Sequence, residues 1–452
     1  MAAFSEQEAA AEKEDRRPYR RVAFHTLGCK VNQFDTEGLI ADFQAHGYRV
    51  VAFDEPAEIY ILNTCAVTKE AERKAGQLIR RIKREHPAAF LVVTGCYAQT
   101  SADGLSALPE VDLVVGVAGR SRLREILEAK LPAGEKNRVL PWAGSGEFEV
   151  LNPDFSGQTR AFLKVEDGCQ SYCSYCIIPF ARGPVRSLPL DLVLKEIDRL
   201  LGLGYKEIVL VGIHLGHYGI DRGDSLAKLL KAVEERWAGT ERRWRLRLGS
   251  IDPTDFTPEL MEILFNAKLL CNHLHIPLQS GSGKILALMN RGYTPDDYAG
   301  LVSVLRKGRP GLAVTTDLMV GFPGETEADF GETLNFLRAV GFSRIHIFPY
   351  SLRAGTAAAK LPGHLPRRVK EERVKQAELI ARELAEDYRN LFLDQVVEVL
   401  IEETNRAGYA EGFSREYLRV QVKEEIKPNS LVRAKVVSAG REPLTGVVVA
   451  PK

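Results

Sequence analysis

The sequence predicts an α/β protein in three parts: an open parallel α/β sheet, a partial (β/α)6 barrel and a small all-β barrel. Two observations predict the first two parts. Short apolar runs alternate with segments of helical spacing over most of the chain, and glycine and polar residues follow the apolar runs. A third observation predicts the last part, because hydrophobic residues alternate with a period of two after residue 395.

The composition is that of an ordinary globular protein, with 45% hydrophobic and 27% charged residues among 452. No apolar run reaches the roughly 18 residues of a membrane span, and residues 1–18 lack the apolar core of a signal peptide, so we expect a flexible tail there. A formal net charge of +1 means that binding of nucleic acid would depend on local patches. The seven cysteines fit metal ligation in a reducing cytoplasm better than they fit disulfides.

The first domain, residues 19–132, is expected to alternate strands with helices. The first helix is placed by the spacing of Leu39, Ile40 and Phe43 and by its stop at Gly47. Strands joined by helices run parallel, so their carboxyl ends share one edge of the sheet, where ligands of open α/β sheets bind. The predicted strands are 21–26, 59–62, 90–93 and 111–115, and the predicted helices are 35–46 and 68–86.

A cysteine directly follows each of the first three of these strands, at Cys29, Cys65 and Cys96. The topology brings the three to one edge although they lie far apart in the sequence. Helices follow these cysteines, and the positive amino-terminal end of a helix stabilises an anionic cluster. We therefore infer a [4Fe–4S] cluster with three thiolate ligands and one open iron. The alternative is three buried structural cysteines, since free cysteine often behaves as a small apolar residue.

Residues 133–154 are rich in glycine, proline and polar residues and indicate a linker. The second domain, residues 155–386, opens with a C-x3-C-x2-C pattern after the apolar run 161–165, at Cys169, Cys173 and Cys176. Three thiolates on one short loop can fill three corners of a cubane cluster and leave the fourth iron open. The alternative is zinc, which needs four ligands, and the nearest spare ones in the sequence are His214, His217 and Cys271.

The rest of the second domain repeats a strand, a polar or glycine-rich segment and a helix. Such a repeat predicts a barrel whose active face lies where the strand ends gather. After the run 161–165, the predicted strands are 207–211, 244–248, 273–277, 313–320 and 344–349, and the predicted helices are 190–201, 225–237, 297–307, 330–340 and 365–393.

Residues 387–452 form the third domain, with predicted strands at 396–401, 417–422, 431–438 and 444–449. This is the size of a small barrel of the kind that binds oligonucleotides. Tyr409, Phe413 and Tyr417 are candidates for stacking on bases, with packing in the barrel core as the alternative.

Six stretches together resemble the methylthiotransferase family of radical S-adenosylmethionine (SAM) enzymes. The GCKVNQFDTE stretch is most similar to the subgroup that acts on N6-threonylcarbamoyladenosine in tRNA, whereas enzymes acting on isopentenyladenosine more often have GCQMN there and enzymes acting on a ribosomal protein more often have GCPKN. The stretches are HTLGCKVNQFDTEG (25–38), NTCAVTKEAERK (63–74), TGCYAQ (94–99), VEDGCQSYCSYCIIPFARGPVRS (165–187), HIPLQSGS (275–282) and GFPGET (321–326).

The resemblance implies two [4Fe–4S] clusters, SAM as cofactor, a radical SAM core and a C-terminal TRAM domain, which is an OB-like RNA-binding barrel. It implies that SAM at the second cluster yields a radical that abstracts hydrogen, and that sulfur held at the first cluster is methylated by another SAM and inserted. The expected reaction converts N6-threonylcarbamoyladenosine at position 37 of tRNA to its 2-methylthio derivative. The expected partners are the tRNA anticodon stem-loop and a reducing donor of the flavodoxin or ferredoxin type, and we expect a cytoplasmic monomer.

Three alternatives remain at this point. The substrate is isopentenyladenosine in tRNA, or an aspartate of a ribosomal protein, or the chain is a non-catalytic RNA-binding iron–sulfur protein that senses redox state. An assay of RNA against protein separates action on tRNA from action on a ribosomal protein. A redox sensor would release no 5′-deoxyadenosine when the reduced protein meets SAM.

The resemblance also suggests site residues, each with a structural alternative. Arg182 and Arg186 are candidates for anchoring the substrate or the SAM carboxylate, or else belong to a solvated loop. Arg73, Lys74, Arg80 and Arg81 are candidates for RNA binding on helix 68–86, or else form a solvated face. Candidates for SAM binding, with turns, capping or packing as the alternative, are Tyr172, Gly212, His214, Gly216, Ser250 and Gln279.

Overall fold

The computed structural model describes residues 20–129, 134–142, 146–155, 158–241 and 243–449, and the predicted tail lies outside these residues. The chain divides into two compact units. Unit 1 comprises residues 1–66, 70–141 and 149–154, and unit 2 comprises the rest. The predicted second and third domains therefore share unit 2. None of the described helices combines the length and hydropathy needed to cross a membrane.

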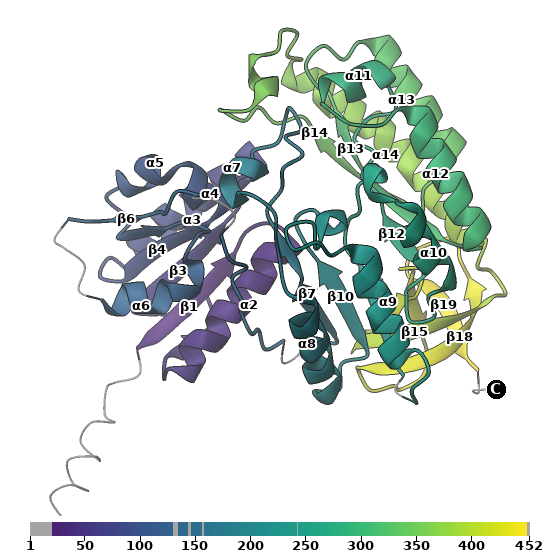
Figure 1. Cartoon of the computed structure of the whole chain (residues 1–452), viewed down its shortest axis with the longest axis horizontal. Helices are drawn as coiled ribbons and strands as arrows, with labels where there is room; N and C mark the ends of the chain where they lie inside the picture. Colours follow the sequence, from purple (N-terminus) through teal and green to yellow (C-terminus); the bar gives the residue numbers. More distant parts are fainter. Residues whose placement is uncertain (1–19, 130–133, 143–145, 156–157, 242, 450–452) are drawn as a thin grey trace, which may run out of the picture. The chain divides into compact units, whose positions relative to one another are not determined.

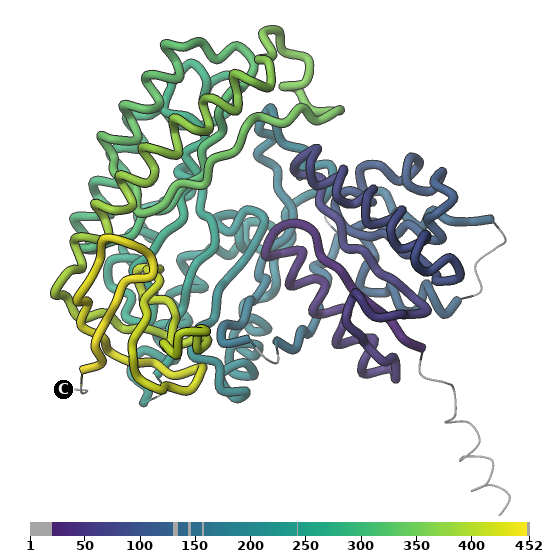
Figure 2. The backbone as a smooth tube through the Cα atoms, turned by 180° about the vertical axis from the view of Figure 1, so that it is seen from behind, coloured from purple at the N-terminus to yellow at the C-terminus, as the bar shows by residue number. Residues whose placement is uncertain are grey.

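Unit 1 is a parallel six-stranded sheet between two layers of helices (Figures 1 and 2). The strand order is β2-β1-β3-β4-β5-β6, and neighbouring strands are parallel throughout. The strands are β1 (Arg21–Thr26), β2 (Arg49–Val51), β3 (Ile59–Thr64), β4 (Phe90–Gly95), β5 (Leu113–Val115) and β6 (Asn137–Arg138).

The two faces of this sheet are covered by different helices because strand side chains alternate. Ile59 and Ile61 pack on the side of α2 (Lys30–Ala45) and α6 (Leu123–Glu128). Tyr60 and Leu62 pack on the side of α3 (Lys69–Glu85), α4 (Cys96–Thr100) and α5 (Ala102–Ser106). The predicted open parallel sheet is confirmed.

Helix α2 begins five residues earlier than the predicted start at Asp35. Cys29 is its N-cap residue, and the buried polar side chains of Asn32, Asp35 and Thr36 lie where the apolar spacing would have continued. Hydrophobic periodicity alone therefore missed the first turns of the helix. The short strand β2 was also missed, and β6 lies in the segment predicted as a linker.

The core of unit 2 is a partial barrel of six parallel strands, as predicted. One sheet has the order β11-β10-β7 and the other β12-β13-β14, and parallel bridges between Leu246 and Leu270 and between Ser250 and His275 join them. The strands are β7 (Arg160–Lys164), β10 (Glu207–Val211), β11 (Arg245–Leu248), β12 (His273–His275), β13 (Ala313–Val320) and β14 (Arg344–Pro349).

Helices line the outside of the partial barrel (Figure 1). The short antiparallel pair of β8 (Glu166–Asp167) and β9 (Arg186–Ser187), together with the short α7 (Ile178–Arg182), frames the cysteine loop. The remaining helices are α8 (Leu190–Gly202), α9 (Leu226–Trp237), α10 (Pro258–Asn266), α11 (Gly283–Leu288), α12 (Pro295–Gly308), α13 (Glu327–Val340) and α14 (Arg367–Asn390).

The carboxyl-terminal strands close into a small barrel in the order β15-β16-β17-β19-β18. Four of the five were predicted, and β16 was missed because it is short and contains Gly412. A Cβ atom at position 412 would lie 1.8 Å from the carbonyl oxygen of Leu400, so the glycine lets the neighbouring backbone approach. The strands are β15 (Val396–Thr404), β16 (Ala410–Ser414), β17 (Arg419–Val422), β18 (Ser430–Ser438) and β19 (Leu444–Val448).

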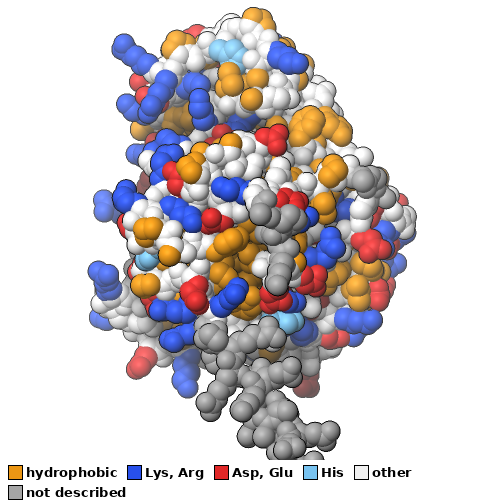
Figure 3. Space-filling model, turned by 90° about the vertical axis from the view of Figure 1, so that its left-hand side faces the viewer, with side chains coloured by type: hydrophobic (Ala, Val, Ile, Leu, Met, Phe, Trp, Pro, Cys, Tyr) orange, Lys and Arg blue, Asp and Glu red, His pale blue; other side chains and the backbone are white. Residues whose placement is uncertain are grey.

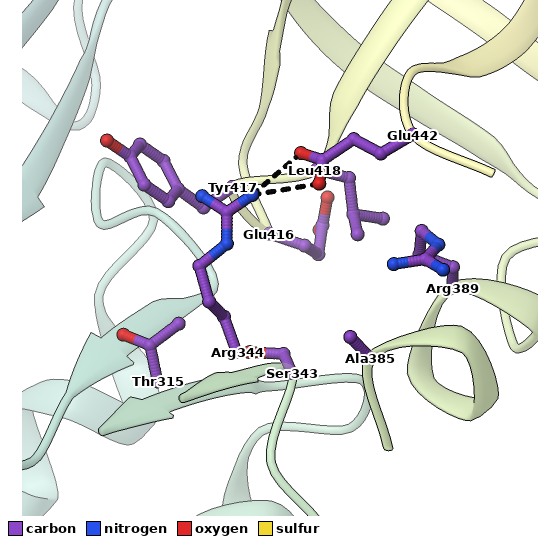
Figure 4. Close-up of a pocket in the computed structure, with 9 residues that line it drawn as sticks. All are labelled: Thr315, Ser343, Arg344, Ala385, Arg389, Glu416, Tyr417, Leu418 and Glu442. Atoms are coloured by element: carbon purple, nitrogen blue, oxygen red, sulfur yellow. Dashed lines mark hydrogen bonds and ion pairs between the residues drawn. The ribbon is translucent and has the colours of Figure 1, made fainter. Parts of the chain in front are cut away.

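This small barrel packs against the amino-terminal ends of the core strands. Arg245 and Arg247, both buried, donate to the main-chain oxygens of Phe413 at 2.8 Å and Ser414 at 3.0 Å, and the buried Glu207 pairs with both guanidinium groups. A pocket at the same junction is lined by β14, α14 and the small barrel, and in it Nη2 of Arg344 donates to both carboxylate oxygens of Glu442 (Figure 4). The amino-terminal edge is therefore covered by structural contacts, which leaves the carboxyl-terminal edge for chemistry.

Phe413 and Tyr417 lie in this junction. The guanidinium of Arg160 lies 4.9 Å from the Phe413 ring centre, and that of Arg247 lies 4.6 Å from the Tyr417 ring centre. Both rings thus contact arginine side chains of the core, and stacking on bases by Tyr409, Phe413 or Tyr417 stays a prediction.

Candidate functional site

Cys169, Cys173 and Cys176 lie on one loop that follows β7 and the short β8 at the carboxyl-terminal edge of the core. The loop turns at Gly168, whose φ is +94° and where a Cβ atom would lie 2.0 Å from the Pro184 carbonyl oxygen. Only glycine fits that position without moving the backbone. The Cys169 N–H then donates to the Gly183 carbonyl at 3.0 Å, which closes the base of the loop.

Buried ion pairs hold this base. Asp167 accepts from the Gly168 N–H at 2.9 Å and from both a Lys164 ammonium at 3.2 Å and an Arg182 guanidinium at 2.9 Å. Arg186 stacks on Trp142 and donates to the Pro184 carbonyl at 2.7 Å. Neither arginine faces solvent, so their role in holding the loop is observed, and contact with a substrate or SAM stays a prediction.

His214 links the cysteine loop to the end of β10. Its Nδ1 lies 3.0 Å from the Ser171 hydroxyl and 3.6 Å from the Cys169 sulfur, while its Nε2 lies 2.7 Å from Asp255. Burial alone would lower the pKa of His214, but hydrogen bonds to Asp255 and Cys169 raise that pKa to about 10. The His217 ring stacks on His214 with ring centres 3.6 Å apart.

Two predicted glycines make room for this arrangement. A Cβ atom at Gly212 would lie 2.6 Å from the Glu166 carboxylate, and one at Gly216 would lie 2.0 Å from the Asp255 carboxylate. Glu166 is fully buried, accepts from the His214 N–H at 2.7 Å, and has its pKa raised by burial to about 8. Gly212, His214 and Gly216 therefore lie beside the cysteine loop, and SAM binding by them stays a prediction.

The other three residues predicted to bind SAM, Tyr172, Ser250 and Gln279, take no part in the contacts around His214 in the described part of the chain. Tyr172 is 56% exposed at the tip of the cysteine loop, with a φ of +47°. Ser250 and Gln279 end their strands as predicted, in bridges to His275 and Leu318. Within the described residues, no side-chain hydrogen bond joins Ser250 or Gln279 to the cysteine loop.

Among the described residues, the side chains whose ligand atoms lie close enough together for one metal ion are His214, His217 and Asp255, with no cysteine among them. Zinc–sulfur bonds of about 2.3 Å in a tetrahedron would bring the sulfurs to roughly 3.8 Å from one another. The three thiols of this loop are therefore not gathered as the ligands of one zinc ion would be. Burial raises the pKa of Cys176 to about 12, whereas hydrogen bonds from His214 and Ser171 outweigh burial and lower the pKa of Cys169. Ligation would therefore release a proton from Cys176.

In unit 1 the three predicted cysteines also stand at the ends of neighbouring strands. Cys29 precedes α2 as its N-cap, Cys65 follows β3, and Cys96 is the first residue of α4. Cys65 and Cys96 are buried, and Cys29 is exposed.

Asn32, in the first turn of α2, contacts all three strand-end loops. Its amide nitrogen donates to the carbonyls of Leu27 at 2.9 Å and Thr64 at 3.2 Å, and its amide oxygen lies 3.9 Å from the Cys96 sulfur. A Cβ atom at Gly28 would lie 2.9 Å from the Cβ of Cys65, so the first two loops touch. The topology thus brings the three strand-end loops that carry the cysteines together at one buried amide.

A buried ion pair also supports this group. Asp35, one turn after Asn32, pairs with Arg120 at 2.9 Å, and both side chains are fully buried. This resembles the pairing of Asp167 with Arg182 under the other cysteine loop.

The predicted RNA-binding residues lie on the outer face of α3. Arg73, Lys74, Arg80 and Arg81 are all exposed, whereas Ala75, Ile79 and Ile82 face the sheet. Arg73 and Arg81 pair with Glu70 and Glu85, which reduces the net charge of the face. On the face drawn in Figure 3, blue Lys and Arg side chains predominate along the left and upper-left side and are interspersed with red acidic ones elsewhere, and RNA binding by α3 stays a prediction.

Sequence reasoning missed several residues of both sites. Asn32 carried a weak signal, because it is a polar residue in the apolar spacing of a helix. Glu166 carried one as well, since it follows directly on the buried run 161–165. Asp252, Asp255 and Arg291 carried none, because only the fold brings them to the cysteine loop. His214 was among the predicted site residues, but its contacts with Ser171 and Cys169 come from the fold.

Two protein families match the sequence. Residues 21–116 match the family described as "Uncharacterized protein family UPF0004", and residues 163–337 match the "Radical SAM superfamily". The first match covers the sheet of unit 1, and the second covers most of the core of unit 2.

Curated relatives match nearly the whole chain. One from Bacillus subtilis, named threonylcarbamoyladenosine tRNA methylthiotransferase, is 41% identical over 93% of this chain and 94% of its own. One of the same name from Aquifex aeolicus is 43% identical over 83% of this chain and 90% of its own. A relative from Thermodesulfovibrio yellowstonii, named tRNA-2-methylthio-N(6)-dimethylallyladenosine synthase, is 34% identical over 95% of this chain and 99% of its own.

Among solved structures, the fold is similar to the radical SAM methyltransferase TsrM from Kitasatospora setae. With cobalamin and a [4Fe–4S] cluster bound, that structure has a TM-score of 0.57 at 15% identity and covers 75% of this chain and 77% of its own. At this identity the likeness concerns the fold alone.

Proposed function

The chain belongs to the methylthiotransferase family of radical SAM enzymes, and from this premise we propose that it converts N6-threonylcarbamoyladenosine in tRNA to its 2-methylthio derivative. The observation that carries the proposal is the match to the Bacillus subtilis enzyme, which is 41% identical over 93% of the chain. The relative named for dimethylallyladenosine is 34% identical, so the threonylcarbamoyl substrate is favoured.

The reaction replaces the C2–H bond of the modified adenine by a C–S bond to a methylthio group. When bound, a [4Fe–4S] cluster and SAM supply the one-electron chemistry that removes the hydrogen, as in the radical SAM superfamily. Cys169, Cys173 and Cys176 are the ligands that fit this cluster. Of the chain's own residues, Asp255 and Ser171 fix the ring of His214 beside Cys169, and Glu166 fixes its main chain.

We also propose that Cys29, Cys65 and Cys96 hold a second [4Fe–4S] cluster, at which the inserted sulfur is held. Convergence of their loops on Asn32 supports this assignment. The carboxyl-terminal barrel has the place and size of a TRAM domain, which supports binding of the tRNA anticodon stem-loop. A flavodoxin-type or ferredoxin-type donor would supply electrons to the enzyme, acting as a monomer in the cytoplasm.

Nucleoside mass spectrometry tests the substrate directly. tRNA from a strain lacking the gene should lose 2-methylthio-N6-threonylcarbamoyladenosine and regain it on complementation, while 2-methylthio-isopentenyladenosine stays unchanged. Complementation with Cys173→Ala should fail. Loss of the isopentenyl derivative alone would contradict the proposed substrate, and loss of neither would contradict action on tRNA adenosine.

A further inference from the structure

Arg291 lies against the cysteine loop from a distant part of the chain. It follows α11, and its Nη1 donates to the Cys173 sulfur at 3.3 Å. Its side chain is 7% exposed. A guanidinium that is shielded from water and touches a ligand thiol acts on the charge of that thiol.

Three hydrogen bonds near Arg291 fix the loop at the same place. We call residues 288–291 the strap. The Ser174 hydroxyl donates to the Leu288 carbonyl at 2.7 Å, and the Ser174 N–H donates to the Met289 carbonyl at 3.0 Å. The amide of Asn290, whose φ is +59°, donates to the Tyr172 carbonyl at 3.2 Å. The strap thus holds the residues on both sides of Cys173.

The guanidinium itself is held from three directions. Besides Cys173, it pairs with Asp252 through Nη2 and donates from Nε to the Tyr293 hydroxyl at 3.2 Å. Tyr293 in turn donates to the Leu278 carbonyl at 2.7 Å. Burial acts to lower the pKa of Arg291, but Tyr293, Tyr175 and Asp252 outweigh it, so the side chain stays charged.

We propose that Arg291 is a positioning residue that sets the reduction potential of a cluster on Cys169, Cys173 and Cys176, with Asp252 offsetting part of its charge. Reduction adds one electron from the donor to the cluster and makes it more negative. A fixed cation and an N–H···S hydrogen bond stabilise that reduced form. The inference rests on the proposed function only in requiring a cluster on this loop.

The test is an EPR-monitored redox titration of the full-length chain, reconstituted anaerobically with iron and sulfide. A Cys29→Ala, Cys65→Ala and Cys96→Ala background removes the thiols of unit 1, so that only the loop cluster is titrated. In this background Arg291→Gln should make the reduced-to-oxidised ratio at a fixed potential about tenfold lower, a shift of about 59 mV to more negative values for one electron. Arg291→Lys, which keeps the charge, should shift it less.

Asp252→Asn tests the same idea with the opposite sign. Removing that carboxylate while Arg291 stays should move the reduction potential to more positive values. If Arg291→Gln assembles no cluster, the potential of Asp252→Asn provides the test. Arg338→Gln, an exposed charge on α13, is the matched control and should leave the potential unchanged. A full iron complement with unchanged potentials in both Arg291→Gln and Asp252→Asn would overturn the inference, whereas absence of any cluster in the background protein would instead contradict the proposed function.

Discussion

Three of the four cysteines of unit 2 lie on one loop of eight residues, the fourth being the buried Cys271, whereas those of unit 1 lie on three loops that follow three parallel strands. The loop group is held by neighbours in the sequence, Gly168, Asp167 and Arg182, with His214 and Arg291 added by the fold. The group in unit 1 is held by Asn32, which contacts all three loops.

The difference teaches how each group depends on its unit. A loop motif carries its geometry within a short stretch of sequence, so its spacing alone identifies it. A group at strand ends exists only if the sheet forms with the right order of strands. Local substitutions should therefore damage the loop group one contact at a time, and damage to the sheet should scatter the other group.

The largest expected effect separates the two groups by product. Replacing Cys169, Cys173 and Cys176 by alanine should abolish both methylthiolation and the release of 5′-deoxyadenosine from SAM. Replacing Cys29, Cys65 and Cys96 should abolish methylthiolation but leave release of 5′-deoxyadenosine, because the loop keeps its ligands. Chromatography with mass spectrometry measures both products, and equal loss of 5′-deoxyadenosine from the two variants would break the comparison.

The buried ion pairs under the two groups should matter about equally for stability. Arg120→Met removes the guanidinium that pairs with Asp35 in unit 1, and Arg182→Met removes one partner of Asp167 in unit 2. Each should lower the free energy of unfolding by about 3–5 kcal/mol, the cost of breaking a buried pair, with Arg182→Met at the lower end because Lys164 remains. Urea unfolding measures this, with Arg367→Met on the exposed face of α14 as a control that should change nothing. A larger loss in the free energy of unfolding for Arg182→Met than for Arg120→Met would contradict this account.

Glycine substitutions should sharpen the comparison with smaller effects. Gly168→Ala collides with main chain and Gly28→Ala with the Cys65 side chain, and both positions have φ above +90°. Each should destabilise its unit by about 1–3 kcal/mol, Gly168→Ala the more, and Gly28→Ala should also lower iron bound in unit 1. Gly104→Ala, with open space at its Cβ, is the control. The same iron content in Gly28→Ala and in the unaltered protein would show that the two loops need no close approach.

The last expected effect changes no ligand and no packing contact, and is a pH dependence that arises beside the loop group. Burial raises the pKa of Glu166 to about 8, above its value in an unfolded chain, so the folded protein holds the extra proton. The free energy of unfolding should therefore fall as the pH rises from about 5 to 8, by up to roughly 1.4 kcal/mol per pH unit. Glu166→Gln should remove this fall between about pH 5 and 6.5, whereas above about pH 6.5 a fall should remain, because the raised pKa of His214 contributes one of its own. In Glu207→Gln the fall should persist, since burial raises the pKa of Glu207 but Arg247 and Arg245 outweigh it and hold it low.

Much of this could be predicted from the sequence where the signal is local or periodic. Strands β10, β13 and β14 were placed with their observed bounds, because glycine follows β10 and β13 and Pro349 ends β14. Both cysteine groups were found, one from its spacing and the other from its position after three strands. Helix α2 was started late because Asn32 and Asp35 interrupt its apolar face.

What could not be predicted is what the fold brings together. Arg291 reaches Cys173, and Asp255 reaches His214, across more than forty residues of sequence that carry no sign of either contact. Arg245 and Arg247 are ordinary charged residues of a strand until the small barrel packs on them. The burial of Arg182 follows in the same way from its pairing with Asp167.

Iron and sulfide analysis of anaerobically reconstituted protein tests the central claim most directly. If each group of three cysteines holds its own cubane cluster, the unaltered chain should bind about eight irons and about eight sulfides. The Cys29→Ala, Cys65→Ala and Cys96→Ala variant, and equally the Cys169→Ala, Cys173→Ala and Cys176→Ala variant, should each bind about four of both. About four irons in the unaltered chain, with no change when the cysteines of unit 1 are replaced, would contradict it.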